Sequence, residues 1–356
     1  MDESYLKQIS RIKKEIDRAI KKFISHKKHE YSYCGETQRK AIDRLGEFAT
    51  RGKSIRGTLF VYTAERLGFQ DKDRLLNFAV AMEIAHSALL IHDDIMDDDL
   101  FRRGKPSIHA QYINDIKKSV KDNEVQTAKS IAISVGDMAF FMAFQLFNSA
   151  VSGLKNGEHI IKKLLNDYSQ TGLGQIDDVF FGASNIEPNS SNILKIYLYK
   201  TARYTFSMPL VMASLFNDSS TKVTSDFDRI GEDIGIVFQI VDDEIGIFGE
   251  KKEIGKTAGI DISRNTKNLI RYFLYKKIPK SKKKILDSIF GKDNLSVDDL
   301  GKIRSLFREF GVKTEIDKIK EKYIKKANNR IKNLATGEDI KNSLVELLVY
   351  VTNRKS

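Results

Sequence analysis

The chain has 356 residues, of which 41% are apolar and 30% charged, a composition typical of a globular protein and unlike that of a disordered chain. Its formal net charge of +12 suggests an anionic partner such as nucleic acid, a membrane surface or a phosphorylated substrate. The single cysteine, Cys34, excludes an internal disulfide and indicates a reducing compartment. We therefore expect a cytoplasmic protein, with no signal peptide at its charged N-terminus.

Helices are expected to fill the N-terminal part of the chain. Residues 1–30 carry apolar side chains at every third or fourth position, which is typical of an amphipathic helix. Further helices are expected over residues 55–68, ended by Gly68, and over residues 73–97, an unusually apolar stretch that ends in acidic residues. Residues 114–128 are polar and predict a loop or a short helix. The apolar positions of the first helix are Leu6, Ile9, Ile12, Ile16 and Ile20.

The segment Ile131–Val151 is the most hydrophobic stretch of suitable length to span a membrane. It contains Asp137, Gln145 and Asn148, which are costly in a lipid environment. We therefore expect a buried helix here rather than a transmembrane one.

The rest of the chain shows further helical patterns and no strand-like alternation. No Pro/Gly/Ser-rich linker, short repeat or low-complexity tract interrupts it. We therefore predict an all-α bundle in a single domain over residues 1–356, including an N-terminal helical extension (1–45) and a Lys-rich helical region (275–335). The further helices are expected over residues 136–151, 158–182, 192–216 with a kink at Pro209, and 226–248.

Two acidic segments lie in apolar helical stretches. The first is Asp93-Asp94-Ile95-Met96-Asp97, and the second contains Asp242-Asp243. Two carboxylates about 4 Å apart repel each other by about 4 kcal/mol at an effective dielectric near 20, so a positive partner is expected. On a helix, Asp93 and Asp97 share a face. This suits Mg²⁺, which takes one or two carboxylates together with waters and phosphate oxygens.

Basic residues accompany these segments: Arg102 and Arg103 follow the first acids, and Lys200 and Lys256 lie on either side of the second. Lys53 and Arg56 lie three residues apart at the start of a predicted helix. Arginine suits bidentate contact with phosphate, and lysine supplies a point charge. Taken singly, an Asp run is as often a solvated helix end as a site, and His86 and His92 are more often packed core histidines than ligands. The combination and its order indicate a phosphate-binding site. The basic residues concerned are Lys53, Arg56, Arg102, Arg103, Lys200 and Lys256.

In order and spacing, these segments resemble the trans-isoprenyl diphosphate synthases, or polyprenyl synthases. The resemblance runs from about residue 45 to 275. The two aspartate-rich motifs of that family are matched by residues 93–106, with their trailing Arg-Arg-Gly-Lys-Pro, and by residues 238–243. The other matched segments are Gly52-Lys53-Ser54-Ile55-Arg56, His86, Gly136-Asp137, Gly174-Gln175 with Asp178, Lys200-Thr201-Ala202, and Gly255-Lys256 with Asp261.

This resemblance implies an isoprenoid-synthase-type helical bundle around a deep central cavity, assembled as a homodimer. It implies a prenyltransferase of isoprenoid biosynthesis that joins isopentenyl diphosphate to an allylic diphosphate, with three Mg²⁺ per active site. Metals and basic residues neutralise the departing diphosphate, and the double bond of isopentenyl diphosphate attacks the allylic carbocation. A proton is then lost to the released pyrophosphate. Water must be kept from the cation, so the acids are expected at the mouth of an apolar cavity.

The resemblance also implies roles for individual residues. The catalytic residues would be Asp93, Asp94, Asp97, Lys200, Asp242 and Asp243, with Asp93, Asp97 and Asp242 as metal ligands. Gln175 and Asp178 would act around the metal site. The allylic substrate would be held by Arg102, Lys200, Thr201, Gln239 and Lys256. Isopentenyl diphosphate would be held by Lys53, Arg56, His86 and Arg103.

Several positions depart from the family pattern. Ser54 and Gly57 replace a basic residue and a proline that are common there, and Gly246 stands where many members carry a third aspartate. Thr266 occupies the place of a lysine that often helps to bind diphosphate, and the neighbouring Lys267 is expected to substitute for it.

The product length is expected to depend on the residues one helical turn, about 5.4 Å, before Asp93. These are Ala88 and Leu89, where short-chain members often carry a bulky aromatic residue. Their small size predicts geranylgeranyl diphosphate or a longer product. Phe140, Phe141 and Phe144 are candidates for a deeper floor, although core packing explains them better.

Three other functions agree less well with the sequence. A non-catalytic regulatory subunit of a heteromeric synthase tends to lose the first acidic motif, which is intact here. A class I terpene cyclase has no use for a second diphosphate site, which Lys53, Arg56 and His86 indicate. No nucleic-acid-binding motif is present, so no such partner is expected. The Lys-rich surface suggests transient contact with anionic lipid.

Overall fold

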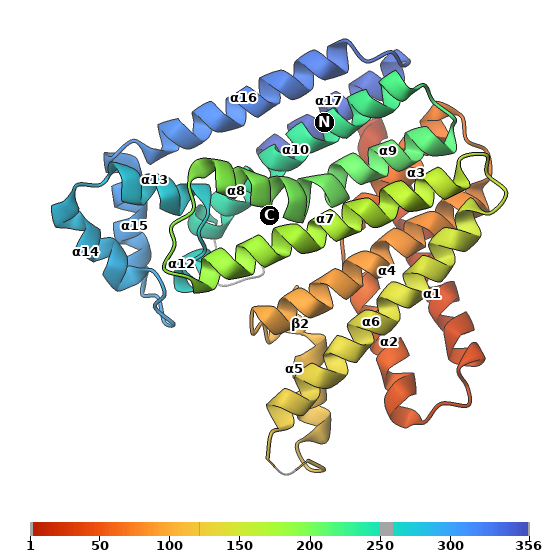
Figure 1. Cartoon of the computed structure of the whole chain (residues 1–356), viewed down its shortest axis with the longest axis horizontal. Coiled ribbons are helices and arrows are strands. Elements are labelled where there is room, and N and C mark those ends of the chain that lie inside the picture. Colours follow the sequence, from red (N-terminus) through yellow and green to blue (C-terminus); the bar gives the residue numbers. More distant parts are fainter. Residues whose placement is uncertain (1–2, 121, 250–258, 355–356) are drawn as a thin grey trace. The chain divides into compact units, whose positions relative to one another are not determined.

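The computed structural model describes residues 3–120, 122–249 and 259–354 (Figure 1). Secondary structure in these ranges is helical, as predicted, except for a hairpin of two-residue strands, β1 (Phe101–Arg102) and β2 (Lys105–Pro106). The chain divides into two compact units, one with residues 2–162 and 215–218, the other with residues 163–214 and 219–356. A single domain over residues 1–356 stays a prediction.

The first unit is built around α4 (Lys72–Met96) and α6 (Glu124–Val151), which pack side by side (Figure 1). The ring of Phe78 on α4 lies at the centre of an aromatic cluster, 4.8 Å from the rings of Phe60 and Phe147 and 4.9 Å from that of Phe216. This core holds the helix that carries the first acidic segment. The other helices of the unit are α1 (Glu3–Glu30), α2 (Glu36–Thr50), α3 (Ile55–Leu67) and α5 (Ile108–Ile116).

Local sequence signals explain where these helices begin and end. The side chain of Asp71 accepts a hydrogen bond from the backbone of Arg74 and so caps α4. Gly68 ends α3 in the left-handed conformation (φ +108°), which a residue without a side chain adopts at little cost. Of the predicted apolar stripe on α1, Ile12, Ile16 and Ile20 are fully buried, but Leu6 is 41% exposed. Helix α2 was not predicted.

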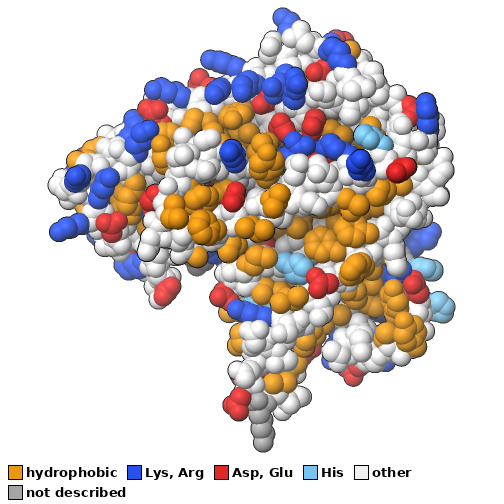
Figure 2. Space-filling view, viewed as in Figure 1, with side chains coloured by type: hydrophobic (Ala, Val, Ile, Leu, Met, Phe, Trp, Pro, Cys, Tyr) orange, Lys and Arg blue, Asp and Glu red, His pale blue; other side chains and the backbone are white. Residues whose placement is uncertain are grey.

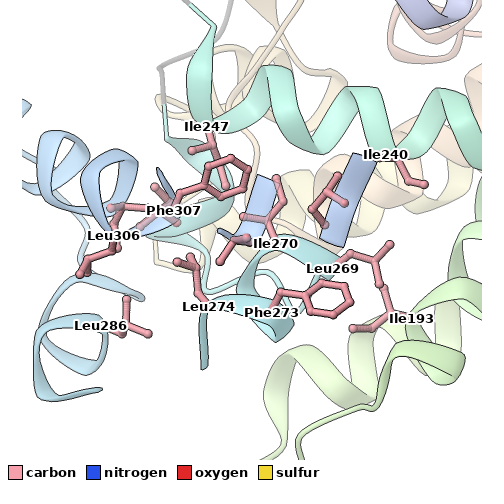
Figure 3. Close-up of a cluster of buried hydrophobic side chains, with 14 of the residues drawn as sticks. Ile193, Ile240, Ile247, Leu269, Ile270, Phe273, Leu274, Leu286, Leu306 and Phe307 are labelled. Atoms are coloured by element: carbon pink, nitrogen blue, oxygen red, sulfur yellow. The ribbon is translucent and has the colours of Figure 1, made fainter. Parts of the chain in front are cut away.

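The second unit is built around α10 (Thr221–Phe248), which packs against η1 (Tyr197–Ser207), α16 (Val312–Lys332) and α17 (Glu338–Asn353). Its other helices are α7 (Gly157–Ala183), α8 (Ser190–Ile196), α9 (Met208–Phe216), α12 (Ile260–Ser263), α13 (Leu269–Lys277), α14 (Lys280–Ile289) and α15 (Val297–Glu309). The Lys-rich region 275–335 thus forms regular helices. Their apolar faces meet in a cluster to which α10 also contributes (Figure 3). Among its members are Ile247, Leu269, Ile270, Leu274, Leu286, Leu306 and Phe307.

The segment expected to be one kinked helix contains a π-helix instead. Residues 197–207 form η1, which ends with the backbone N–H of Met208 bonded to the carbonyl of Arg203, five residues earlier. Pro209 follows in the first turn of α9. A proline ring clashes with the carbonyl four residues before it, and a widened turn relieves that clash. Pro209 therefore follows a widened π-helical stretch that leaves room for its ring, and the kink itself stays a prediction.

Two helices, α4 and α6, are long and apolar enough to cross a membrane by length and composition alone. The apolar window of α4 is 72% buried, as in the core helix of a globular protein, whereas that of α6 is 39% buried. The prediction of a buried α6 therefore holds for part of its surface. Phe141 on α6 is 69% exposed, and Ile133 is 44% exposed.

Candidate active site

The first acidic segment ends α4, and its carboxylates differ in exposure. Asp97 is the C-terminal cap of the helix, with its N–H bonded to the carbonyl of Asp93 at 2.9 Å. Asp93 is half-buried and Asp97 is exposed, so the predicted pair on one face is accessible to a ligand. Asp94 is fully buried. The structure thus separates two carboxylates suited to a metal from one that points into the protein.

Arg102 binds this acidic segment from the β1–β2 hairpin. Its Nη2 lies 3.0 Å from Asp93 and 3.7 Å from Asp99, and its Nε donates to Asp94. The hairpin turn places Arg103 and Gly104 at positive φ, which suits a tight connection with right-handed twist. Burial raises the pKa of Asp94 to about 7, although Arg102 opposes the shift. Arg102 and Asp94 therefore form a buried pair that supports the motif.

The residues predicted to hold isopentenyl diphosphate lie close together in the same unit. Arg56 is 7% exposed at the start of α3, and His86 is 8% exposed on α4. Burial and then the charges of Arg56, Arg103 and Arg102 hold the pKa of His86 well below its usual value, so its imidazole is neutral at pH 7. Lys53 is exposed just before α3. Lys53, Arg56 and Arg103 thus form a cationic group beside the neutral His86, and this group suits a small polyanion.

Gly52 makes room for one of these cations. A Cβ atom at this position would lie 2.6 Å from Nη1 of Arg103. The glycine of the GKxxR segment therefore lets the guanidinium of Arg103 approach the backbone beside Lys53 and Arg56. The glycine of the GKxxR pattern thus has a geometric reason in this structure.

On α6, Gly136 likewise makes room for a side chain of another helix. A Cβ at Gly136 would lie 2.3 Å from Nε2 of His92, which stands 3.5 Å from Asp137 and 3.2 Å from the carbonyl oxygen of Ile133. His92 is therefore a packed histidine that joins α4 to α6, as expected. The motif positions the helix that carries the first acids.

In the second unit, Lys200 and Thr201 lie on the π-helix η1. The Nζ of Lys200 is 2.5 Å from Oδ2 of Asp178 on α7, and the hydroxyl of Thr201 donates to Oε1 of Gln239 at 2.9 Å. The amide of Gln239 in turn donates to Asp243 at 3.0 Å. The structure thus joins the KTA, GQxxD and second acidic segments in one network. π-Helices are frequent at functional sites.

The two carboxylates of the second acidic segment also differ in exposure. Asp242 is exposed, and Arg354 at the end of α17 donates to it. Asp243 is 5% exposed and accepts from the phenol of Tyr197 as well as from Gln239. Burial, and then Asp261, raise the pKa of Asp243 well above its usual value. Only Asp242 is therefore exposed to a ligand.

Tyr197 and Arg354 were missed by the sequence interpretation. Tyr197 also accepts a hydrogen bond from the backbone N–H of Leu269 at 3.1 Å, so it joins η1 to α13. An ordinary tyrosine three residues before Lys200 carries no visible signal. Arg354 lies 112 positions after Asp242, and no pattern relates the two residues.

The space beside Gly246, where a third aspartate is common, is filled by another acid. A Cβ at Gly246 would lie 2.5 Å from Oδ2 of Asp261. Lys256, predicted to hold the allylic substrate, lies outside the described residues. The Nζ of Lys267, expected to substitute for the missing lysine, binds the carbonyls of Ser184 and Ile186 beyond α7, at 2.7 and 2.9 Å. Its role in diphosphate binding stays a prediction.

The donor set suits a hard divalent cation. Within the described residues, no group of three or more His, Cys, Asp or Glu side chains is close enough to hold a metal by itself. The accessible carboxylates of Asp93 and Asp97 fit Mg²⁺, which usually binds through one or two carboxylates and completes its shell with water and phosphate oxygens. The protein therefore provides part of a metal site, to be completed by a phosphorylated ligand.

Ala88 and Leu89 lie on α4 before the acids, as required for the predicted role in product length. Ala88 is fully buried and Leu89 is half-buried. Phe140 packs on α6 with His92 and Phe144, at ring distances of 5.9 and 6.1 Å. Phe141 is 69% exposed, so within its own unit it forms no floor.

Comparison with known proteins decides the family. The polyprenyl synthetase family model matches residues 40–307, three quarters of the chain. The chain belongs to the polyprenyl synthetase family. The short chain isoprenyl diphosphate synthase of Methanocaldococcus jannaschii is 30% identical over 249 residues, 70% of each chain. The geranylgeranyl diphosphate synthase of Saccharolobus solfataricus is 28% identical over 277 residues, 77% of this chain and 78% of the relative.

Solved structures confirm the fold. A geranylgeranyl pyrophosphate synthase from Corynebacterium glutamicum, complexed with isoprenyl diphosphate and magnesium, matches with a TM-score of 0.90 at 22% identity and covers 97% of this chain and 99% of its own. The predicted all-α isoprenoid synthase fold is thus confirmed. As a family member, the polyprenyl synthetase described here is an enzyme, a prenyltransferase of isoprenoid biosynthesis, as its motifs predicted.

Proposed function

We propose that this polyprenyl synthetase joins isopentenyl diphosphate to an allylic diphosphate and releases pyrophosphate. The observation that carries the proposal is the pair of anion-handling sites in the first unit. The accessible carboxylates of Asp93 and Asp97 suit a metal-bound diphosphate, whereas the cations Arg56, which is buried, and Arg103 suit a diphosphate without metal. A cyclase that takes one diphosphate has no use for the second site.

The reaction balances without a dedicated protein base. The allylic C–O bond breaks, and its electron pair leaves with pyrophosphate. The double bond of isopentenyl diphosphate attacks the allylic carbocation, and the proton lost from the adjacent carbon goes to pyrophosphate. Lys200 and Arg102 would contribute positive charge toward the leaving group.

Mg²⁺ is the metal that we propose, and when bound it would neutralise charge on the leaving diphosphate. Asp93 and Asp97 would be ligands in the first unit, and Asp242 in the second. Asp94 and Asp243 are buried and hydrogen-bonded, so they would orient the exposed acids beside them. Three ions per active site stays a prediction.

Geranylgeranyl diphosphate or a longer trans-polyprenyl diphosphate is the product that we propose, because Ala88 and Leu89 place no aromatic ring one turn before Asp93. Two relatives support this length range: the Saccharolobus enzyme, and a geranylfarnesyl diphosphate synthase of Aeropyrum pernix that is 28% identical over 308 residues, 85% of this chain and 90% of the relative.

One experiment tests the activity and the product together. The protein is incubated with labelled isopentenyl diphosphate, Mg²⁺ and dimethylallyl, geranyl or farnesyl diphosphate, and the products are sized. We expect chains of twenty carbons or more, and none with EDTA or with Asp93→Asn. Label that stays in isopentenyl diphosphate with all three primers would contradict the proposed function.

A homodimer is proposed as the assembly. The partly exposed apolar surface of α6, with Ile133 and Phe141, supports a second copy as its partner. Light scattering after gel filtration should give twice the chain mass, and Phe141→Glu should shift the protein toward the monomer. A wild-type monomer would contradict this assembly.

We propose a cytoplasmic location from the single cysteine, Cys34, and transient contact with anionic lipid from the net charge of +12. Figure 2 shows Lys and Arg side chains gathered over α16, where Lys313, Lys318 and Lys325 are exposed. Sedimentation with vesicles that contain anionic lipid tests this contact. Binding should disappear at high salt, and equal binding to neutral vesicles would contradict it.

A further inference from the structure

Glu83 on α4 is a buried carboxylate that the roles given above do not use. It is 3% exposed and lies one turn before His86. Its Oε1 accepts a hydrogen bond from the backbone N–H of Gly57 at 2.9 Å. Gly57 lies in the first turn of α3, which also carries Arg56. This contact therefore joins the helix of His86 to the turn that presents Arg56.

The charges around Glu83 belong to the isopentenyl diphosphate site. Burial raises the pKa of Glu83, while Arg56, the N–H of Gly57 and Arg103 favour its ionised form. Burial lowers the pKa of Arg103, as do the charges of Arg102 and Arg56, whereas Glu83 opposes this shift. The charges of Arg56 and Arg103 thus repel each other, and both are attracted to Glu83.

We propose that Glu83 is the positioning residue of the isopentenyl diphosphate site. Its carboxylate fixes the first turn of α3 through Gly57 and holds the guanidinium groups of Arg56 and Arg103 in the arrangement that binds diphosphate. Glu83 itself does not contact the substrate. The inference rests on the proposed function and deepens it, because it predicts an effect on one of the two substrates only.

Two substitutions separate charge from hydrogen bonding. Glu83→Gln keeps the size and an acceptor for Gly57 but removes the charge, whereas Glu83→Asp keeps the charge and withdraws it by one methylene group. For Glu83→Gln, we expect the KM for isopentenyl diphosphate to rise about tenfold and the KM for the allylic substrate to change less than about twofold. Glu83→Asp should show a smaller rise in the same KM.

A binding measurement without catalysis gives a second readout. Calorimetry with isopentenyl diphosphate in EDTA should show affinity about tenfold weaker for Glu83→Gln than for the wild type. Ser87→Ala is the matched control, because Ser87 is buried one turn further along α4 and its hydroxyl bonds the carbonyl of Glu83 at 2.8 Å. Its KM values and affinity should match the wild type. Circular dichroism checks that each variant is folded. If Glu83→Gln does not fold, the same measurements are made on Glu83→Asp.

Three results would overturn the role of Glu83. The first is an unchanged KM for isopentenyl diphosphate, and the second is an equal change in the KM values of both substrates. The third is tighter binding of isopentenyl diphosphate by Glu83→Gln, which would show that Glu83 only repels diphosphate. A wild-type protein that transfers no prenyl group would refute the proposed function instead. The calorimetric comparison would still decide whether Glu83 positions an anion site.

Discussion

Arg354 donates a hydrogen bond to Asp242, so the end of the last helix supplies the cation of the second acidic segment. The guanidinium carbon of Arg354 lies 3.9 Å from the ring centroid of Phe238, one turn before Asp242 on α10. Arg354 is 7% exposed, whereas Asp242 is 53% exposed. The arginine is thus held by packing, and the carboxylate stays open to solvent. A metal that binds Asp242 would compete with Arg354.

We expect Arg354→Ala to lower the stability of the metal-free protein by about 1 kcal/mol, because an ion pair and a cation–π contact are lost. Thermal unfolding in EDTA measures the loss. The same scan with Mg²⁺ and a bisphosphonate should show a larger stabilisation by ligand in the variant than in the wild type. Lys325→Ala, at an 81% exposed side chain on α16, is the control. A ligand effect equal to that of the wild type would contradict the competition.

Product length should respond to Ala88. Ala88→Phe places an aromatic ring one turn before Asp93, so we expect the main product to shorten by at least one five-carbon unit. Chromatography of the dephosphorylated products measures this. Val297→Phe is the control, because it adds the same ring at a position on α15 that is 89% exposed and should leave the product unchanged. The role assigned to Ala88 fails if the two variants give the wild-type product.

Stability should depend on pH through Asp94. Its pKa in the folded protein is about 7, above the ordinary value of 3.8, so the folded state binds this proton more tightly than the unfolded state. The resulting stability is fully present below about pH 4 and is lost as the pH rises through 7, by an amount on the order of a few kcal/mol. Urea unfolding in EDTA between pH 4 and 8 should therefore give a flatter profile for Asp94→Asn. Parallel profiles would contradict the shifted pKa.

Two glycines should be required for the position of Lys200. A Cβ at Gly174 would lie 2.7 Å from the backbone nitrogen of Lys200, and one at Gly235 would lie 2.4 Å from Cα of Ala202. Gly174→Ala should therefore cost about 1–3 kcal/mol and reduce kcat, because η1 must shift. Gly172→Ala on the same helix meets nothing within 4 Å and should be neutral or stabilising by up to about 1 kcal/mol. Similar effects of both changes would refute the close contact.

The sequence was informative where a physical rule is local. Apolar periodicity and Gly68 identify α1, α3 and α4, and the order of the acidic and basic segments identifies the family. A rule based on spacing also placed Asp93 and Asp97 on one accessible face. Short-range patterns of this kind need no knowledge of the fold.

Features that depend on tertiary contacts were not visible in advance. The π-helix η1 depends on packing against glycines of α7 and α10, and the burial of Asp243 depends on Tyr197. Arg354 and Glu83 act on residues far away in the chain or on another helix. The contacts of Lys267 with backbone carbonyls beyond α7 could not be predicted from its place in the sequence either.

In the π-helix η1, the direction of each side chain depends on how many residues precede it in the wide turns. Each residue of an α-helix advances the side-chain direction by about 100°, and a π-type turn absorbs one additional residue. Deleting one residue just before Lys200 would rotate Lys200 and Thr201 by about 100° relative to the preceding chain, away from Asp178 and Gln239. The spacing of this segment is therefore as strict a requirement as the identity of its side chains.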